Sequence, residues 1–214
     1  MRDKRELQNL YRRRARFYDL SANLYYCLGF REYAYRKQAV EELRIKGGNS
    51  VVEIGCGTGL NFSLLQEKVG PDGRIIGVDL TEKMLDRARK KVERRGWKNV
   101  QLVQSDAARY DFPENLSGII STFAISLVPE FDEVIHNGAE ALHSGGHFVI
   151  LDLKRPKAVP IWLVGLGVFL TKPFGVSLDL MDRHPWESIS RYLAEVSHTE
   201  LYGGFAYISV GKAE

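Results

Sequence analysis

Hydrophobic residues between positions 50 and 155 form short runs, often β-branched, that alternate with longer amphipathic stretches. Short apolar runs that end at turn residues are typical of buried parallel strands, whereas apolar residues three and four positions apart are typical of helices. The pattern predicts strands near 50–54, 74–78, 100–103, 119–123 and 147–153. It predicts helices from Leu60 to before Gly70, from Thr81 to Gly96 and from Glu130 to Leu142. This alternation predicts an α/β fold: a doubly wound, mostly parallel sheet with helices on both faces.

Less regular segments flank this alternation. Before it, helices are predicted at residues 4–18 and from Glu32 to Arg44. After Pro156 the apolar segment 157–181 shows no clear period. The chain closes with a predicted helix at 187–196 and two strands around a Gly-Gly hairpin turn, His198–Tyr202 and Phe205–Val210.

The composition limits the number of domains. With 214 residues, 44% hydrophobic and 27% charged, the chain can bury one substantial core and is short for two ordinary domains. We therefore predict a single domain with a helical N-terminal cap, a core that carries the alternating elements, and a final segment with the closing strands, at residues 1–46, 47–155 and 156–214.

Cysteine content and hydropathy bear on the cellular compartment. Cys27 and Cys56 are too few for a disulfide framework and lack the spacing of a zinc site, so we expect reduced, buried thiols. No secretory signal follows the first basic residues, and the longest apolar stretch, Val159–Leu170, is shorter than the about 20 residues that span a bilayer. We expect a cytoplasmic protein that is not integral to a membrane.

The positive charge lies at the N-terminus. The formal net charge is +3, and residues 1–20 carry seven basic and three acidic side chains. A basic amphipathic helix at residues 2–18 would suit the headgroup region of an anionic membrane, which predicts peripheral attachment at the inner face. The alternative is a helix that caps the domain with its arginines in water. Contact with nucleic acid is the least favoured reading, and we expect none.

A glycine loop follows the first strand of the alternating region. Gly55, Gly57 and Gly59 let the backbone turn away from the strand, and the helix that follows leaves free amide donors at its N-terminus, which together indicate a nucleotide site. A dinucleotide-binding dehydrogenase would place its third glycine at position 60, which is Leu60 here. No Walker lysine follows the loop either, so a phosphate-cradling site is excluded.

Four motifs continue this pattern at the ends of successive strands. They are Val51–Gly59 (Val-Val-Glu-Ile-Gly-Cys-Gly-Thr-Gly), Ile76–Asp79, Gln104–Ala107 and Ile119–Ala124. Together they resemble the class I S-adenosylmethionine-dependent methyltransferases over about residues 45–155. The resemblance implies a Rossmann-like fold with a seven-stranded, mostly parallel sheet, a helical N-terminal extension and an antiparallel C-terminal strand.

The resemblance also implies donor contacts. Glu53 and the glycine-loop backbone would face the methionine part of S-adenosylmethionine, Asp79 would bind both ribose hydroxyls, and Asp106 with Ala107 would hold the adenine edge. A carboxylate can accept both hydrogen bonds of a cis-diol, which suits Asp79; ordinary helix-start and turn chemistry is the alternative for the two aspartates. The candidate donor-binding residues are Glu53, Gly55, Cys56, Gly57, Thr58, Gly59, Asp79, Leu80, Met84, Asp106, Ala107 and Phe123.

The fourth motif lacks the residues of two other methyltransferase chemistries. Phe123–Pro129 carries neither the metal-binding acid of catechol-type enzymes nor the Asp/Asn-Pro-Pro-aromatic box of nucleic-acid amino-methyltransferases. We therefore expect no metal site and no base methylation.

Weaker motifs bear on the acceptor. Phe17–Leu20, Met84–Arg89 and Leu127–Pro129 resemble both the bacterial phosphatidylethanolamine N-methyltransferases and the quinone-biosynthesis C-methyltransferases, and Leu201–Ala206 resembles the end of the quinone group. Val159–Leu166 would line an acyl or isoprenoid channel or form a buried lid. These features predict a small-molecule or lipid acceptor.

Side chains near the acceptor need mainly to align an amine and exclude water. The candidates are Tyr18, Tyr25 and Tyr26, which would close over the methyl group, and His184, which would act as a base. The leading hypothesis is N-methylation of a phospholipid amine headgroup. The alternatives are C- or O-methylation of a quinone precursor, methylation of a soluble amine or phenol, and a non-catalytic protein that binds S-adenosylmethionine. The oligomeric state is not predicted.

Overall fold

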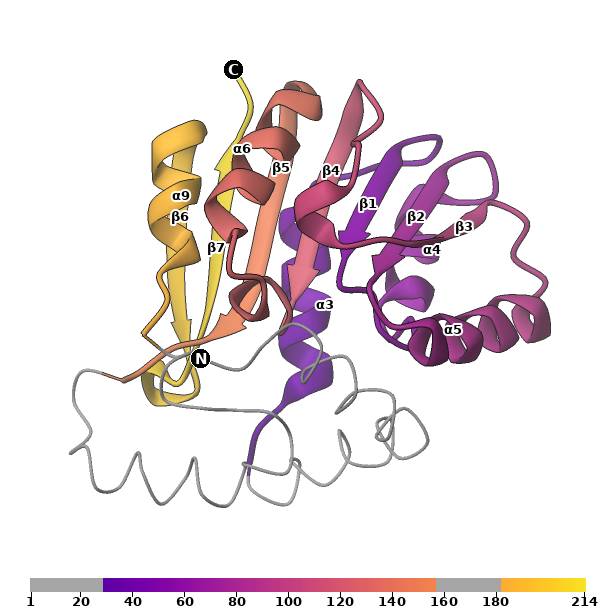
Figure 1. Ribbon diagram of the computed structural model, residues 1–214, viewed down its shortest axis with the longest axis horizontal. Helices are drawn as coiled ribbons and strands as arrows, with labels where there is room; N and C mark the ends of the chain where they lie inside the picture. Colours follow the sequence, from indigo (N-terminus) through magenta and orange to yellow (C-terminus); the bar gives the residue numbers. More distant parts are fainter. Residues whose placement is uncertain (1–28, 157–181) are drawn as a thin grey trace.

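The computed structural model describes residues 29–156 and 182–214. Seven strands form one sheet in the order β3-β2-β1-β4-β5-β7-β6. Strands β1 to β5 pair in parallel, and β7 runs antiparallel between β5 and β6 (Figure 1). The strands are β1 Ser50–Ile54, β2 Arg74–Asp79, β3 Val100–Gln104, β4 Leu116–Thr122, β5 Leu142–Leu153, β6 Ala194–Leu201 and β7 Ala206–Lys212. The predicted α/β sheet with an antiparallel closing strand is confirmed.

Helices cover both faces of the sheet (Figure 1). One layer of the core joins the sheet to α3 Glu32–Glu42, α4 Phe62–Val69 and α5 Glu82–Arg95. The other joins it to α6 Phe131–Ala141 and α9 Pro185–Tyr192. Successive side chains of a strand point to opposite faces, so Val51 packs in the first layer and Val52 in the second. The sheet is therefore doubly wound, as predicted, and three 3₁₀ turns follow strand ends: η2 Ala107–Arg109, η3 Ile125–Leu127 and η5 Tyr202–Gly204.

Helix α5 forms where the sequence predicts a helix from Thr81 to Gly96. Met84, Leu85 and Ala88 are buried along one side of α5, and Gly96 ends the helix in the left-handed conformation with φ of 68°. Thr81 stands at the N-cap position but makes no side-chain capping bond. Asp79, at the end of β2, instead accepts a hydrogen bond from the backbone N–H of Thr81.

The C-terminal elements differ from the sequence expectation. The helix predicted to reach Val196 ends at Tyr192, and β6 begins at Ala194, which pairs with Lys212 of β7. β6 lies at the edge of the sheet, and most of its side chains are exposed. Its sequence therefore does not need the apolar alternation by which a half-buried strand is recognised. β5 also begins five residues before the predicted start, because its first residues continue directly from α6.

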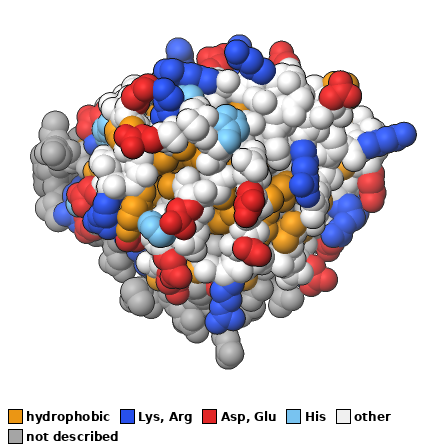
Figure 2. Space-filling model, turned by 90° about the horizontal axis from the view of Figure 1, so that it is seen from above, with side chains coloured by type: hydrophobic (Ala, Val, Ile, Leu, Met, Phe, Trp, Pro, Cys, Tyr) orange, Lys and Arg blue, Asp and Glu red, His pale blue; other side chains and the backbone are white. Residues whose placement is uncertain are grey.

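Several predictions fall outside the described residues. These are the basic helix at 2–18, the apolar segment Val159–Leu166, and Tyr18, Tyr25 and Tyr26. Within the described ranges, no helix is long and apolar enough to cross a membrane. Figure 2 shows the face seen from above, where described Lys and Arg side chains lie among Asp and Glu side chains and apolar groups appear between them.

Candidate active site

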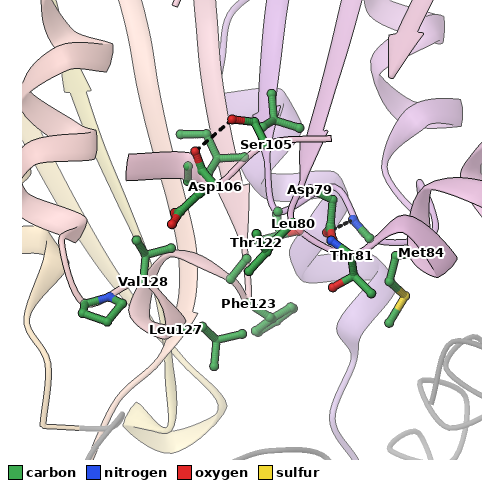
Figure 3. Close-up of a pocket in the computed structure, with 17 residues that line it drawn as sticks. Asp79, Leu80, Thr81, Met84, Ser105, Asp106, Thr122, Phe123, Leu127 and Val128 are labelled. Carbon is green, nitrogen blue, oxygen red and sulfur yellow. Dashed lines mark hydrogen bonds between the residues drawn. The ribbon is translucent and has the colours of Figure 1, made fainter. Parts of the chain in front are cut away.

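A pocket opens where β1, β2, β3 and β4 end, and we call it the Asp79 pocket. Ligands of open α/β sheets bind in this position, outside the carboxyl ends of the strands. Figure 3 shows Asp79 and Asp106 above Thr122 and Phe123, with Leu127 and Val128 to one side and Thr81 and Met84 to the other. The full lining is Ile54, Gly55, Gly57, Val78, Asp79, Leu80, Thr81, Met84, Ser105, Asp106, Ala107, Thr122, Phe123, Ala124, Leu127, Val128 and Pro129.

The glycine loop forms one wall of the Asp79 pocket. Gly55 has φ of 67°, and a Cβ built on it would overlap the Cβ of Ala124. A side chain at position 55 would therefore push apart the loops that follow β1 and β4. Gly59 also has a positive φ, and a Cβ there would lie within 2.6 Å of the Phe62 ring. Glycine at position 55 lets the chain pass close to the pocket, and glycine at position 59 leaves room for the Phe62 ring.

Asp79 links the glycine loop to the start of α5. Its Oδ2 accepts a hydrogen bond from the N–H of Gly57 at 2.9 Å, and its Oδ1 accepts one from the N–H of Thr81 at 2.7 Å. Burial raises the pKa of the Asp79 carboxyl, and these two bonds oppose the shift. Each carboxylate oxygen can accept a further bond. Asp79 is thus rigidly held and can still receive the two hydroxyls of a ribose.

Asp106 occupies the corresponding place after β3. Its Oδ1 accepts a hydrogen bond from the N–H of Ala108 at 3.1 Å, which makes it the N-cap of η2. The same pocket is lined by apolar side chains from helix α5 and from two loops, among them Met84, Leu80 and Val128. Apolar side chains together with a carboxylate suit an adenine ring with its exocyclic amine.

The charge of the lining also restricts the ligand. The described lining contains two carboxylates and no Lys or Arg. Nucleotide phosphates would be repelled here, whereas S-adenosylmethionine has no phosphate and carries a sulfonium cation. The residues present therefore fit S-adenosylmethionine.

Four of the predicted donor-binding residues lie behind the lining. Glu53 is 1% exposed, and its Oε1 accepts a hydrogen bond from Nδ2 of Asn61 at 2.8 Å. Burial raises the pKa of Glu53 to about 8, and the nearby Arg36 and the Asn61 bond oppose this shift. Cys56 and Thr58 are buried, and Gly59 packs on the next helix. The expected contact of Glu53 with the methionine part stays a prediction.

His184 lies beside β6 and β7, where its neighbour Trp186 contacts His198 and Tyr207. It precedes α9, its Nδ1 lies 3.0 Å from Oε1 of Glu187, and its ring centroid is 4.5 Å from that of Trp186. It does not line the Asp79 pocket. Its proposed role as a base stays a prediction.

Sequence reasoning missed several lining residues. Ser105, Thr122 and Ala124 lie within the motifs Gln104–Ala107 and Ile119–Ala124 but were not among the candidate donor-binding residues. Leu127, Val128 and Pro129 enter the wall because η3 turns the chain back over the pocket.

Within the described ranges, no group of three or more His, Cys, Asp or Glu side chains is arranged to hold a metal ion.

The fold and the Asp79 pocket resemble those of class I S-adenosylmethionine-dependent methyltransferases, whose methyl donor is S-adenosylmethionine. A family model described as a methyltransferase domain matches residues 51–146. The solved S-adenosylmethionine-dependent methyltransferase of Aquifex aeolicus has a TM-score of 0.58 and 20% identity, covering 84% of this chain and 89% of that one. A chain of the complex between the Haloferax volcanii Trm112 methyltransferase activator and a putative methyltransferase has a TM-score of 0.69 and 18% identity, covering 92% and 95%. These structures show the fold.

The names of the curated relatives specify a substrate. The demethylmenaquinone methyltransferase of Listeria welshimeri is 30% identical over 129 residues, which is 60% of this chain and 54% of that protein. That of Lactobacillus johnsonii is 32% identical over 154 residues, or 71% and 62%. The chain thus spans between half and two thirds of the length of these curated relatives.

Proposed function

We propose that this protein transfers the methyl group of S-adenosylmethionine to a ring carbon of a reduced demethylquinone. The observation that carries the proposal is the match to relatives named demethylmenaquinone methyltransferase, at 30% and 32% identity. The closing motif Leu201–Ala206, which resembles the quinone group, supports the same acceptor. The phospholipid amine that the sequence favoured has no counterpart among these relatives and becomes the second candidate, supported by the basic pattern of residues 2–18.

Aromatic side chains beside the Asp79 pocket support a flat acceptor. Phe30, Tyr35, Phe123, Tyr202 and Phe205 form a group that we call the Phe30 cluster. The centroid of the Phe30 ring lies 5.3 Å from the ring centroid of Tyr35, 5.9 Å from that of Phe123 and 5.2 Å from that of Tyr202. Phe123 lines the Asp79 pocket, and Tyr202 is 39% exposed. Aromatic faces stack on flat rings, so the cluster suits a quinone ring at the edge of the donor site.

The described residues act mainly by placement. Asp79 and Asp106 would hold the ribose and adenine, and Phe123 would exclude water from the side where the acceptor ring approaches. In the transfer, a ring carbon of the acceptor forms the new bond to the methyl carbon, and the old carbon–sulfur electron pair stays on sulfur. The ring then loses one proton from that carbon. Transfer therefore requires an electron-rich, reduced ring.

Methyl transfer to defined acceptors tests the proposal. The full chain is incubated with methyl-labelled S-adenosylmethionine and with one of three acceptors: a reduced demethylmenaquinone, phosphatidylethanolamine vesicles, or a soluble catechol. We expect the label in the quinol, detected by mass spectrometry of the extracted lipid. Label in phosphatidylethanolamine or in the catechol, with none in the quinol, would overturn the quinone assignment.

A further inference from the structure

Buried polar side chains form a connected group behind the Asp79 pocket, which we call the Arg36 network. It consists of Glu32, Arg36, Glu53, Asn61 and Thr122, each at most 8% exposed. Arg36 donates from Nε to Glu32 at 2.8 Å and from Nη1 to Oγ1 of Thr122 at 2.5 Å and Oδ1 of Asn61 at 3.3 Å. Asn61 donates from Nδ2 to Glu53 at 2.8 Å and to Thr122 at 3.0 Å. One guanidinium on α3 thus ties together the end of β1, the start of α4 and the end of β4.

The Arg36 network reaches the pocket wall through two consecutive residues. Thr122 and Phe123 both line the Asp79 pocket, and the guanidinium carbon of Arg36 lies 5.1 Å from the centre of the Phe123 ring. Phe123 has φ of 55°, a left-handed conformation that is strained for a bulky residue and persists only when its surroundings hold it. The cation–π contact and the Thr122 bond supply this support.

The network also surrounds the buried carboxyl of Glu53. Besides Asn61, the groups that act on it are Arg36 of α3, Lys91 of α5 and Asp79 of β2. Its Oε2 is buried and has no hydrogen-bond partner within the described part of the chain. Arg36 is the strongest influence that favours the ionised form of Glu53. An ionised carboxylate behind the glycine loop favours a cationic ligand in front of it.

We propose that Arg36 is a positioning residue for the methyl donor: it holds Thr122 and Phe123 as the pocket wall and, through Asn61, aligns Glu53 behind the glycine loop. This inference rests on the proposed function for its ligand, S-adenosylmethionine, and is independent of the acceptor. No side chain of the network other than Thr122 lines the pocket.

Donor binding to the full chain tests this proposal, measured by calorimetry with S-adenosylmethionine between pH 6 and pH 9. For Arg36→Met we expect at least 10-fold weaker binding at pH 7.5 and a pH midpoint that moves upward, because Glu53 loses the charge that favours its ionisation. Arg36→Lys keeps the charge but not the forked geometry, so its midpoint should stay near that of the wild type. Lys37→Met, on the same helix with a side chain 60% exposed, is the matched control and should change neither quantity.

The pH midpoint separates positioning from a general loss of structure. A purely structural role of Arg36 would weaken S-adenosylmethionine binding equally at all pH values. Binding within twofold of the wild type would show that Arg36 does not position the donor. Either result overturns the proposal. If Arg36→Met does not fold, the double variant Glu32→Gln/Arg36→Met removes both members of the buried ion pair and is measured in the same way. If the midpoint moves as expected while no quinol is methylated, the proposed acceptor fails and the role of Arg36 stands.

Discussion

The two halves of the carboxyl edge of the sheet are built differently. The Asp79 pocket, at the ends of β1 to β4, is hollow, and its polar groups are fixed by backbone bonds such as those from Gly57 and Thr81 to Asp79. At the ends of β5 and β6 and the start of β7, side chains pack against one another. Lys154 pairs with Glu200, and its Nζ lies 5.5 Å from the Trp186 ring.

This second half contains aromatic and basic side chains that contact one another. Tyr207 is fully buried, with its ring centroid 4.8 Å from Trp186 and 5.2 Å from His198. These residues come from three separate elements, so their contacts depend on how α9 docks on the sheet. The comparison teaches that local backbone geometry places the side chains of the donor site, whereas packing between distant elements places those of the other half. The predictions below test that division, from the largest expected effect to the smallest.

Gly55→Ala should give the largest effect. The new Cβ would meet Ala124 while the backbone holds a φ of 67°, and overpacking and left-handed strain together cost about 2–5 kcal/mol. We expect S-adenosylmethionine affinity to fall by about 100-fold or more, measured by calorimetry. Gly47→Ala is the control, because a Cβ at Gly47 has open space and the position needs no positive φ. Equal affinity in the two variants would contradict the described loop geometry.

Glu53→Gln should change how stability depends on pH. Burial raises the pKa of Glu53 to about 8 in the folded protein from its ordinary value of 4.5, so between these values the folded state binds more protons than the unfolded state. Stability contributed by the protonated carboxyl is complete below about pH 4.5 and is lost as pH rises through 8. The wild type should therefore lose on the order of 5 kcal/mol across this window relative to the variant.

Urea unfolding at several pH values measures this difference. Glu41→Gln, at an exposed position on the same helix as Arg36, is the control and should follow the wild type. Parallel curves for the wild type and Glu53→Gln would show that Glu53 does not titrate with a raised pKa.

Asp79→Ala should weaken donor binding by about 1–3 kcal/mol, because it would remove the acceptors that we predict for both ribose hydroxyls. It also removes the brace between the glycine loop and α5. Calorimetry gives the affinity, and Asp86→Ala, at a half-exposed position on α5, should leave it unchanged. Unaltered binding by the Asp79 variant would refute its role.

The same division explains what the sequence could predict. Asp79 and Asp106 were predictable because a short run of residues fixes both the strand and the turn that follows it. The hidden position of Glu53 was not, because Arg36 and Asn61 determine it from α3 and the start of α4. The start of β6 at Ala194 was missed because pairing with β7 overrides a weak local pattern.

Tyr202→Ala tests binding of the acceptor. Under the proposed function, loss of this partly exposed ring removes stacking worth about 1 kcal/mol, so the KM for the quinol should rise about fivefold. Donor affinity should not change, since Tyr202 does not line the Asp79 pocket. Tyr33→Ala, which removes the exposed tyrosine of α3, is the control. A rise in the donor KM alone would place the Phe30 cluster with the donor instead.

His184→Ala should give the smallest effect. A general base contributes about 10²–10⁴-fold to a rate, whereas a half-exposed histidine beside Glu187 that precedes α9 contributes mainly to local packing. We therefore expect kcat to stay within about twofold of the wild type. Glu187→Gln, which removes the same contact from the other side, should match it. A fall of about 100-fold in the His184 variant alone, together with loss of the basic limb of the pH–rate profile, would instead identify His184 as the base and would mean that the packed half of the sheet takes part in the chemistry.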